Sequence, residues 1–548
     1  MAVKISVNQA GYVADLPKIA SVSGSAKKFH IFRSDGTKPA FSGLLLGAMH
    51  DSASGDRVLS ADFSQFCEEG EFYIKVGSSR SPVFTISKAP YKPLLEDIKK
   101  SLYFFRCGSA LHRNRAGKFG RKPCHIEPAT FYDDKERTLD VSGGWHDAGD
   151  YSRCVVTGCV ALGHLLYAYS LFPEVFGDKD GISQSGRNCP LIIEECLYEL
   201  EWLLKMQDKD GGVYHRVSSL HYAGLVMPSD DKETQYIFRK TASATALFAA
   251  VTALAARILE PMGMRIIKKL RPAALAAWAW LLNNPDYTPF ENDKNIVSPE
   301  YSDDFLDDDI FWAAAELYAL TGERNFSERA EELAGVIDTT GFTIGNVGGF
   351  GALAYIKSDC EKNPEIKSVL ENKLTHRAET ICSSARHSGY RSSLSPDEYS
   401  WCSNLKILTN AMTVISANIL EGRDEFLTEI LGHINYILGN NPLSLSYITG
   451  QGSNSVRKPH FRPTIADNNT EAIPGMVVTG PDKNRSDEYS QWLIPYGTPP
   501  AKCYLDLEHC HSTNETTIYL NSAATFLFGY ISDLCRRDTN SAHNKKER

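Results

Sequence analysis

Two aspartates three residues apart are the most chemically suggestive feature of the chain. Asp147 and Asp150 belong to the segment Ser142-Gly-Gly-Trp-His-Asp-Ala-Gly-Asp-Tyr151, which also carries glycines and aromatic residues. On the first turn of a helix, this spacing would place both carboxylates on one face. Paired carboxylates beside aromatic rings suit the activation of water for attack on a sugar, whereas an isolated pair more often caps a helix and complements its dipole.

A second group of residues has the chemistry of metal ligands. Cys107, Cys124, His125 and His146 supply two thiolates and two imidazoles, the donor set of a closed tetrahedral zinc site. His146 directly precedes Asp147. Spacing alone favours the alternative, which is two buried cysteines and two unrelated histidines.

The bulk composition is that of a globular protein with more than one domain. The chain has 548 residues, of which 43% are hydrophobic and 23% are charged. Its net charge of -9 argues against nucleic acid and an anionic membrane surface as partners, and mildly favours a neutral or cationic substrate. The composition specifies no oligomeric state.

Cysteine usage and the N-terminus bear on the cellular compartment. Thirteen cysteines, an odd number, are scattered from Cys67 to Cys535, which is typical of a reduced intracellular protein rather than of a disulfide framework. The first residues show no charged region followed by a long apolar segment, and we find no apolar run long enough to span a bilayer. If Met1 is the native start, we expect a cytoplasmic protein.

The first 88 residues have the pattern of a small β-sandwich. Alternating apolar residues predict strands over 29–32, 71–76 and 83–86, bounded by turn-forming residues. Several short strands with regular turn signals are typical of sandwiches. The segment Ala89-Pro-Tyr-Lys-Pro93 then forms a stiff link, because its two prolines disfavour helix around them.

Helical periodicity dominates from residue 94 to residue 536. The expected helices cover 94–106, 154–171, 191–206, 243–259, 265–283, 309–320, 327–336, 403–420, 424–438 and 515–534. Such a set fits a single α/α toroid whose loops form a cleft at one end. Two loops, 207–240 and 440–505, are long and rich in Gly, Pro and Asp, which favours a functional role. We expect residues 537–548 to form a flexible tail.

Four stretches, spread over nearly the whole chain, resemble glycoside hydrolase family nine. Gly143-Gly-Trp-His-Asp-Ala-Gly-Asp150 is similar to the family's catalytic-base motif. Asn8-Gln-Ala-Gly-Tyr12 resembles the opening strand of the immunoglobulin-like domain that precedes many of its catalytic domains, and residues 436–462 and 504–522 resemble its two signatures. The resemblance implies a mainly α fold, in which an (α/α)6 barrel (94–536) follows an immunoglobulin-like β-sandwich (1–88). It also implies inverting hydrolysis of β-1,4-linked glucans or related sugars.

The same resemblance assigns roles to individual residues. It implies that Asp150 is the general base, that Asp147 helps to hold the attacking water, and that Glu515, expected on the first turn of a helix, is the general acid. The residues that would bind the sugar at the −1 subsite are His460 and Arg462. The candidate sugar-stacking platforms are Trp145, Tyr214, Trp401 and Tyr504. Family members with the sandwich often carry a structural zinc, which favours zinc at the Cys/His group, and calcium is a further candidate cofactor.

Two departures from the family signature bear on the substrate. His511 and Leu520 stand near the expected acid at positions that are usually aromatic, and they argue against ordinary cellulose binding. Together with a cytoplasmic location, this favours exo-action on short imported β-1,4-linked oligosaccharides. Similar bacterial members include exo-β-D-glucosaminidases, which act on chitosan oligosaccharides, and β-glucosidases, which act on cello-oligosaccharides. The acidic run 303–309 could supply a carboxylate for a glucosamine amine, although a solvated helix start accounts for it more simply.

Other classes of function are alternatives. An endo-β-1,4-glucanase (cellulase) would keep the same acid and base. A non-catalytic sugar-binding protein on this fold should have lost Asp150 or Glu515, and both are present. A polysaccharide lyase would need a basic cleft, which the net charge does not suggest, and an epimerase would use paired histidines such as His509 and His511.

Overall fold

The computed structural model describes residues 3–177, 189–467, 469 and 471–546. The chain divides into two compact units. The first unit consists of Met1–Ser101, Ala378–His460 and Thr470–Arg548, and the second of Leu102–Arg377 and Phe461–Asn469. Each unit is therefore built from segments that lie far apart in the sequence.

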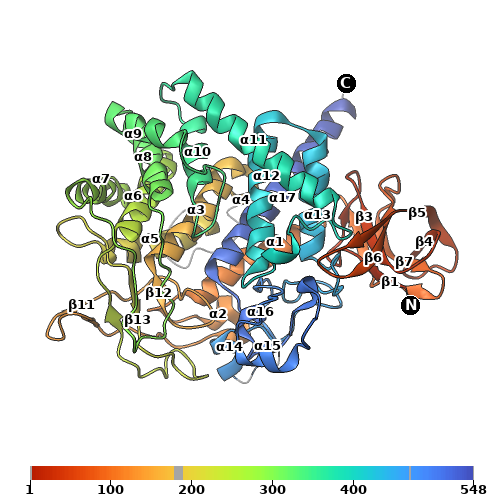
Figure 1. Ribbon diagram of the computed structural model, residues 1–548, viewed down its shortest axis with the longest axis horizontal. Helices are drawn as coiled ribbons and strands as arrows, with labels where there is room; N and C mark the ends of the chain where they lie inside the picture. The colour runs from red at the N-terminus through yellow and green to blue at the C-terminus, as the bar shows by residue number, and fades with distance from the viewer. Residues whose placement is uncertain (1–2, 178–188, 468, 470, 547–548) are drawn as a thin grey trace. The chain divides into compact units, whose positions relative to one another are not determined.

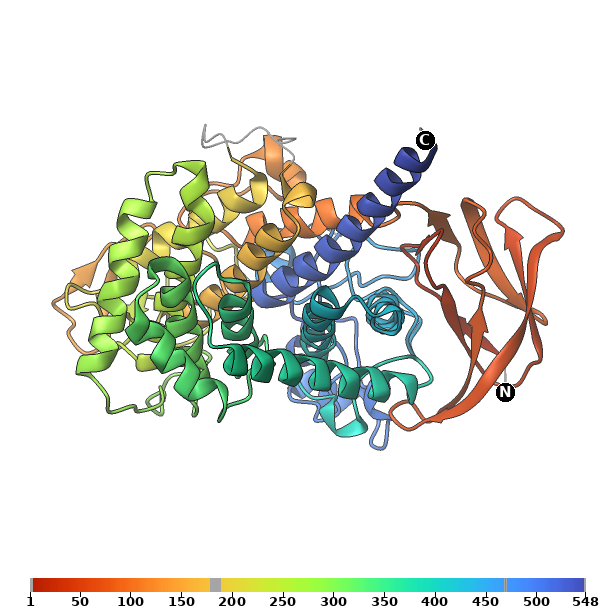
Figure 2. The same ribbon diagram turned by 90° about the horizontal axis from the view of Figure 1, so that it is seen from above.

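The first unit begins with a β-sandwich, drawn in red to orange in Figures 1 and 2. Its strands are β1 Lys4–Ser6, β2 Tyr12–Val13, β3 Ile19–Ser23, β4 Lys28–Arg33, β5 Pro39–Asp51, β6 Asp56–Asp62, β7 Gly70–Val76, β8 Ser79–Arg80 and β9 Phe84–Ser87. They pair in the order β1-β3-β6-β5-β4-β7-β9-β2, with β8 beside β7. The long β5 serves both layers, since its first half pairs with β4 and its second half with β6. Gly47, at φ 64°, lies where the pairing of the second half with β6 is interrupted between Leu46 and Met49.

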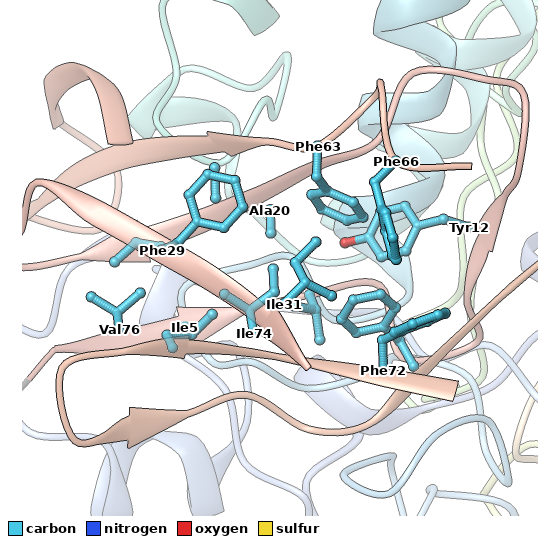
Figure 3. Close-up of a cluster of buried hydrophobic side chains, with 14 of the residues drawn as sticks. Ile5, Tyr12, Ala20, Phe29, Ile31, Phe63, Phe66, Phe72, Ile74 and Val76 are labelled. Carbon is cyan, nitrogen blue, oxygen red and sulfur yellow. The ribbon is translucent and has the colours of Figure 1, made fainter. Parts of the chain in front are cut away.

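Apolar side chains fill the space between the layers of the sandwich (Figure 3). In β4, Phe29 and Ile31 are buried and their neighbours are not, and in β7 the same holds for Phe72 and Ile74. This period of two is the sequence signal of a half-buried strand. All four side chains are 0% exposed, so the sandwich has a core of its own.

Helices complete the first unit. They are α1 Lys92–Ser101, the last part of α11 Pro364–Arg386, α12 Ser403–Glu421, α13 Asp424–Ile437, α15 Glu488–Leu493, α16 His511–Asn514 and α17 Ile518–Lys546, with the 3-10 turns η4 Pro396–Glu398 and η5 Pro500–Lys502. α12 packs against α13 and α17, and α1 packs against α17. α1, α12, α13 and α17 therefore form one packed group within the unit.

Buried polar contacts join the sandwich to α13 and to the segment that follows it. The Asn8 side chain donates to Asn435 of α13 (2.8 Å) and to the Tyr91 hydroxyl (3.0 Å). The Ser6 hydroxyl donates to the carbonyl of Asn441 (3.0 Å). Because these groups are buried, each one needs its partner. The sandwich therefore supports the helices of its own unit.

The second unit contains the remaining helices and a small sheet. The helices are α2 Arg113–Ala116, α3 Val155–Leu171, α4 Pro173–Phe176, α5 Leu191–Met206, α6 Ala242–Leu259, α7 Ile267–Asn283, α8 Asp307–Thr321, α9 Arg324–Ala334, α10 Gly348–Lys357, most of α11, and α14 Arg462–Ala466. α6 packs against α3, α7 and α8. The sheet has the order β11-β10-β14-β13-β12, made of Ala129–Phe131 (β10), Thr138–Leu139 (β11), Arg153–Cys154 (β12), Arg216–Ser218 (β13) and Tyr236–Ile237 (β14).

One helical stretch of the second unit corrects an expectation. Residues Ala242–Met262 are long and apolar enough to cross a membrane by length and composition, although we expected no such run. However, 89% of their most apolar window is buried inside the protein. A helix that is apolar on every side and buried is a core helix, and this explains the composition of α6.

Most of the expected helices and strands are present, with ends shifted by a few residues. Neither α10 nor α11 was predicted. α10 begins with Gly348 and Gly349, which oppose helix formation. α11 is largely polar, and its buried stripe is narrow. The two long loops contain β13, β14, α14 and α15, and α17 continues to Lys546 through the residues expected to form a tail.

The substitution Asn8→Ala tests the support that the sandwich gives to α13. It removes a donor from Asn435, which is 4% exposed, and we expect it to lower the free energy of unfolding by about 1–3 kcal/mol. Chemical denaturation measures the change. Asn484→Ala, at an exposed position of the same unit, is the matched control and should cost less than about 0.5 kcal/mol. Equal stability of the two variants would show that the contact contributes nothing.

Candidate functional site

The segment that holds the paired aspartates is a loop, not the helical turn that the spacing predicted. It ends at β12, and Arg153 of this strand lies opposite Val217 of β13. The Asp147 N–H donates to the carbonyl of Ser152 (2.8 Å), which closes the loop on itself. Sheet pairing, which no local pattern of residues indicates, therefore fixes the position of the loop.

Asp147 and Asp150 are both buried, at 1% and 6% exposure. Oδ2 of Asp147 accepts a hydrogen bond from the Tyr301 hydroxyl, and Oδ2 of Asp150 accepts one from Ser152 (2.8 Å). Among the described residues, Oδ1 of each aspartate has no hydrogen-bond partner. Burial, with the charge of Asp150 adding to it, raises the pKa of Asp147 to about 7. Two unsatisfied carboxylate oxygens on one loop are suited to holding a water molecule.

Glu515 lies in extended backbone between α16 and α17, and not on the first turn of a helix as expected. Its carbonyl accepts the Thr479 N–H (2.9 Å), and its backbone forms a parallel bridge with His460. Asn514 and Thr516 are 0% exposed, whereas the Glu515 side chain is only partly buried. Alternation along an extended segment explains the difference, because successive side chains point to opposite faces.

The two predicted sugar-binding residues belong to different units. His460 is held by a hydrogen bond between its Nδ1 and the carbonyl of Glu508 (2.6 Å), which places a hydrogen on Nδ1. The Arg462 N–H donates to the carbonyl of Gly149, in the aspartate loop (3.1 Å). The Arg462 guanidinium lies 5.3 Å from the centre of the Tyr222 ring. Arg462 is thus attached to the loop that carries Asp147 and Asp150.

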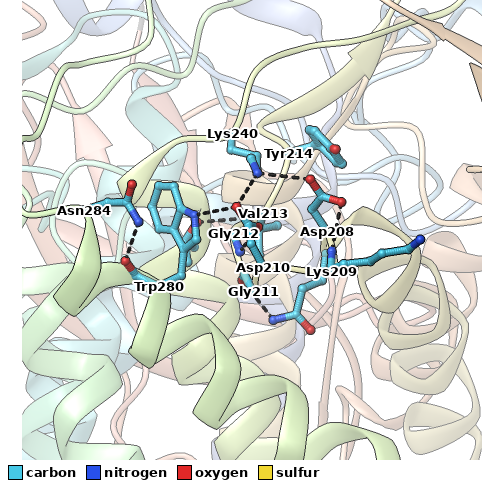
Figure 4. Close-up of polar contacts among 12 residues, drawn as sticks. Asp208, Lys209, Asp210, Gly211, Gly212, Val213, Tyr214, Lys240, Trp280 and Asn284 are labelled. Atoms are coloured by element: carbon cyan, nitrogen blue, oxygen red, sulfur yellow. Dashed lines mark hydrogen bonds and ion pairs between the residues drawn. The ribbon is translucent and has the colours of Figure 1, made fainter. Parts of the chain in front are cut away.

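Two of the four predicted sugar-stacking rings do not fit that role. Trp145 is 1% exposed, and its indole N–H donates to Glu195 (2.9 Å). Tyr214 is 5% exposed and lies beside the Asp208–Lys240 ion pair in the loop after α5 (Figure 4). A stacking platform must expose a ring face, so the burial of these two rings corrects the prediction.

The other two rings have different environments. Trp401 is 38% exposed and keeps an accessible ring. Tyr504 is partly buried, and its hydroxyl donates to Asn514 (2.5 Å), the residue directly before Glu515. Tyr504 therefore supports the segment of Glu515 from within the first unit.

The predicted metal-binding residues Cys107, Cys124, His125 and His146 lie together. One possible ligand atom from each lies within 4.8 Å of the others. Cys124 Sγ is 3.9 Å from Cys107 Sγ and 3.7 Å from His146 Nε2, and Cys107 Sγ is 3.6 Å from His125 Nδ1. Ligands at zinc bond lengths around a tetrahedron stand about 3.5–3.8 Å apart, so the spacing fits a zinc ion.

Surrounding groups orient the side chains of this Cys/His cluster and influence their charge. His125 Nε2 lies 3.1 Å from a carboxylate oxygen of Asp231, which orients the ring so that Nδ1 points to the sulfurs. His125 adopts φ 49°, a left-handed conformation that is uncommon for histidine. Contact with Cys107, followed by the nearby His146, lowers the pKa of the Cys124 thiol far below its usual value. The cluster thus favours a thiolate, the form that binds metals.

A second cluster consists of the buried carboxylates of Asp303, Asp308 and Asp309, with one oxygen of each within 4.8 Å of the others. The Val347 N–H donates to Asp308 (2.7 Å), but in the described part of the chain both oxygens of Asp309 lack a partner. Burial, followed by the charges of Asp308 and Asp303, raises the pKa of Asp309 well above its usual value. The expectation of a solvated helix start is therefore wrong for Asp308 and Asp309.

Sequence reasoning missed two residues that support the aspartate loop. Tyr301 donates to Asp147 from the segment before α8, and no local pattern marks it. Glu199 of α5 accepts the Trp145 N–H (2.7 Å), and burial raises the pKa of Glu199 to about 8. The sequence did offer a signal for Glu199, because an acidic residue within the apolar stripe of 191–206 is expected to be buried and to need a partner.

Comparison with known families agrees with the fold. Residues 91–528 match the model of glycosyl hydrolase family 9, and residues 2–81 match the cellulase N-terminal ig-like domain. The chain belongs to glycosyl hydrolase family 9. It is an inverting glycoside hydrolase, in which an immunoglobulin-like β domain precedes an (α/α)6-barrel domain, as the sequence predicted.

Individual relatives cover nearly the full chain. A cellodextrinase of Butyrivibrio fibrisolvens is 34% identical, over 96% of this chain and 99% of its own length. A metagenome-derived family 9 endoglucanase of known structure is 31% identical, with a TM-score of 0.91, over 97% of this chain and 99% of its own. A zinc-binding triple mutant of the family 9 endoglucanase J30 is 30% identical, with a TM-score of 0.90, over 95% of this chain and 99% of its own.

Proposed function

We propose that this enzyme hydrolyses β-1,4-linked glucan oligosaccharides, with Asp150 as general base and Glu515 as general acid. The observation that carries the proposal is the pair of buried aspartates, each of which has an Oδ1 without a hydrogen-bond partner in the part of the chain that the structure describes. Inverting hydrolysis requires an ionised carboxylate that holds a water on one side of the sugar. It also requires a protonated carboxyl on the other side, about 6.5–9.5 Å away.

The reaction would proceed in one displacement. Asp150 takes a proton from the water as the water oxygen attacks the anomeric carbon, and Glu515 gives a proton to the departing glycosidic oxygen. Ser152 fixes the orientation of the Asp150 carboxylate, and Tyr301 fixes that of Asp147, which shares in holding the water. Attack from the face opposite the leaving group converts a β-linkage into an α-anomer.

The relatives favour glucans over glucosamine oligomers. The names cellodextrinase and endoglucanase both describe action on β-1,4-linked glucose, and so they support the glucanase alternative better than an exo-glucosaminidase. The burial of Asp308 and Asp309 weakens the glucosamine prediction further, because these carboxylates pack against one another inside the unit. Short cello-oligosaccharides agree with the names of the relatives and also with the departures from the family signature at His511 and Leu520.

The two clusters suit different cations. We assign zinc to the Cys/His cluster, because two thiolates and two imidazoles close a tetrahedron and leave no position for a reacting water. The carboxylate cluster, which offers only oxygen, suits calcium. A divalent cation there would neutralise buried charges that otherwise repel one another.

We also propose a cytoplasmic location. No cysteine in the described residues forms a disulfide bond, which is the state expected in a reducing compartment. Short glucans would then reach the enzyme only after uptake.

Replacing the acid or the base should abolish hydrolysis without unfolding the protein. We expect Asp150→Asn and Glu515→Gln each to lower kcat/KM on cellotetraose by about 100-fold or more, because each removes a proton-transfer group. Asp140→Asn, at an exposed aspartate near the loop, is the matched control. NMR of the first product should show the α-anomer, and full activity of either variant would contradict the assignment.

Zinc can be tested by metal analysis of the purified protein. We expect about one zinc per chain, and a melting temperature that falls by several degrees on chelation, because the metal binds the folded state. Cys124→Ser should lose the zinc, whereas Cys67→Ser, at an exposed cysteine, should keep it. Stoichiometric zinc in Cys124→Ser would exclude this cluster as the site.

Calcium can be tested by melting the protein in calcium or in EGTA. We expect calcium to raise the melting temperature of the wild type, and Asp309→Asn to remove that response. Asp304→Asn, at the exposed aspartate of the same run, should respond like the wild type. An unchanged calcium response in Asp309→Asn would remove the proposal.

A further inference from the structure

We propose that aromatic side chains at the surface, on and beside α15, bind the glucan chain at a distance from the cleaved bond. The group consists of Tyr489, Trp492 and His509, here named the α15 platform. This inference rests on the proposed function, because it takes the enzyme to act on β-1,4-linked glucans.

The rings of the α15 platform form one continuous set of contacts. The Tyr489 ring lies 5.8 Å from the Trp492 ring and 5.2 Å from the His509 ring, and it is nearly parallel to the histidine at 24°. Trp492 is 70% exposed, so its indole is accessible from solvent. The rings therefore offer an apolar surface at the outside of the first unit.

The burial pattern of α15 is the reverse of an ordinary surface helix. Its buried residue is Ser490, whereas Trp492 and the neighbouring Leu493, at 53% exposure, face solvent. Leaving large apolar side chains in water sacrifices the stabilisation that burial would give. A contiguous exposed apolar group usually marks a binding surface.

A single buried carboxylate fixes the platform to the segment of the proposed acid. Asp487 caps α15 by accepting the Ser490 N–H (2.8 Å), and its other oxygen accepts the Ser512 N–H of α16 (2.9 Å). Ser512 lies three residues before Glu515. The platform and the acid are thus carried by directly connected elements of one unit.

The chemistry of the surface fits a neutral β-1,4-glucan. The C–H faces of glucose rings are apolar and pack on aromatic rings, while their hydroxyls need hydrogen-bonding groups at the rim. Glu488 and Gln491 on α15 are exposed, and the carboxylate of Glu508 lies 3.7 Å from His509. Rings flanked by such polar groups recognise sugar chains rather than a purely apolar partner. Connection to the acid segment favours the substrate over a second protein.

The test compares substrates of different length on the full-length enzyme. In Trp492→Ala, we expect kcat/KM on cellohexaose to fall by about fivefold, the loss of one ring contact, while kcat/KM on cellobiose or cellotriose stays unchanged. Trp492→Phe, which keeps a ring, should restore most of the activity on cellohexaose. Tyr73→Ala is the matched control, since Tyr73 is an aromatic residue of the sandwich stacked on Phe32 at 5.4 Å. Tyr73→Ala should leave kcat/KM unchanged on both the long and the short substrates.

Other outcomes would overturn the proposal. An equal loss on all lengths, or no loss on cellohexaose, would exclude a distant glucan subsite. A change of sedimentation coefficient in Trp492→Ala with unchanged kinetics would show that the platform binds a second copy of the chain instead.

Calorimetric titration separates this inference from the proposed function. If the wild type hydrolyses no cello-oligosaccharide, the proposed function fails. The platform is then judged by the affinity of wild type and Trp492→Ala for cellohexaose. Equal affinities, or no binding by either protein, would overturn it.

Discussion

An irregular loop carries the proposed base of this enzyme, and the loop can do so because its backbone is tied at several points. The Cys107 N–H donates to the carbonyl of Gly144 and the His146 N–H to that of Phe105, both at 2.7 Å. Asp147 then closes the loop through Ser152. A regular helix would satisfy its own backbone groups, whereas this loop must find each partner elsewhere. Cys107 and His146 of the Cys/His cluster belong to the same backbone segments, so the zinc proposed there would share its scaffold with the aspartates.

Burial of carboxyl groups is the main electrostatic difficulty of the second unit. Burial raises the pKa of Asp147 and of Asp308 to about 7, and that of Glu199 to about 8. Each of these groups resists ionisation, since water no longer solvates its charge. Nearby hydrogen-bond donors compensate in part: the Tyr301 hydroxyl donates to Asp147, and the backbone N–H of Trp145 donates to Glu199. The burial of apolar helices such as α6 supplies stabilisation that offsets the cost of burying these carboxyl groups.

Residue chemistry was easier to predict than geometry. The two cysteines and two histidines that the family resemblance singled out as metal ligands lie in one cluster. The spacing of Asp147 and Asp150 identified them, but the helical turn assumed for them is wrong, since pairing between β12 and β13 is a non-local interaction. The same limit applies to Asp308 and Asp309: acidic residues at a helix start are normally solvated, and only packing within the unit reveals that these two are buried. α11 was not predicted because its buried stripe contains few apolar residues.

The contrast between Trp145 and Trp492 shows why residue type alone does not locate a sugar-binding surface. Trp145 belongs to the motif and lies within two residues of Asp147, yet Glu195 holds its indole N–H, and Arg106 binds Glu195 in turn (2.7 Å). Its burial makes it part of the scaffold beneath the aspartate loop. Trp492 belongs to no motif and is mostly exposed, on a helix that a shared carboxylate fixes to the segment of Glu515. An aromatic residue next to the proposed catalytic aspartates can therefore have a purely structural role. In our proposal, exposed segments such as α15 make the contacts that distinguish long substrates from short ones.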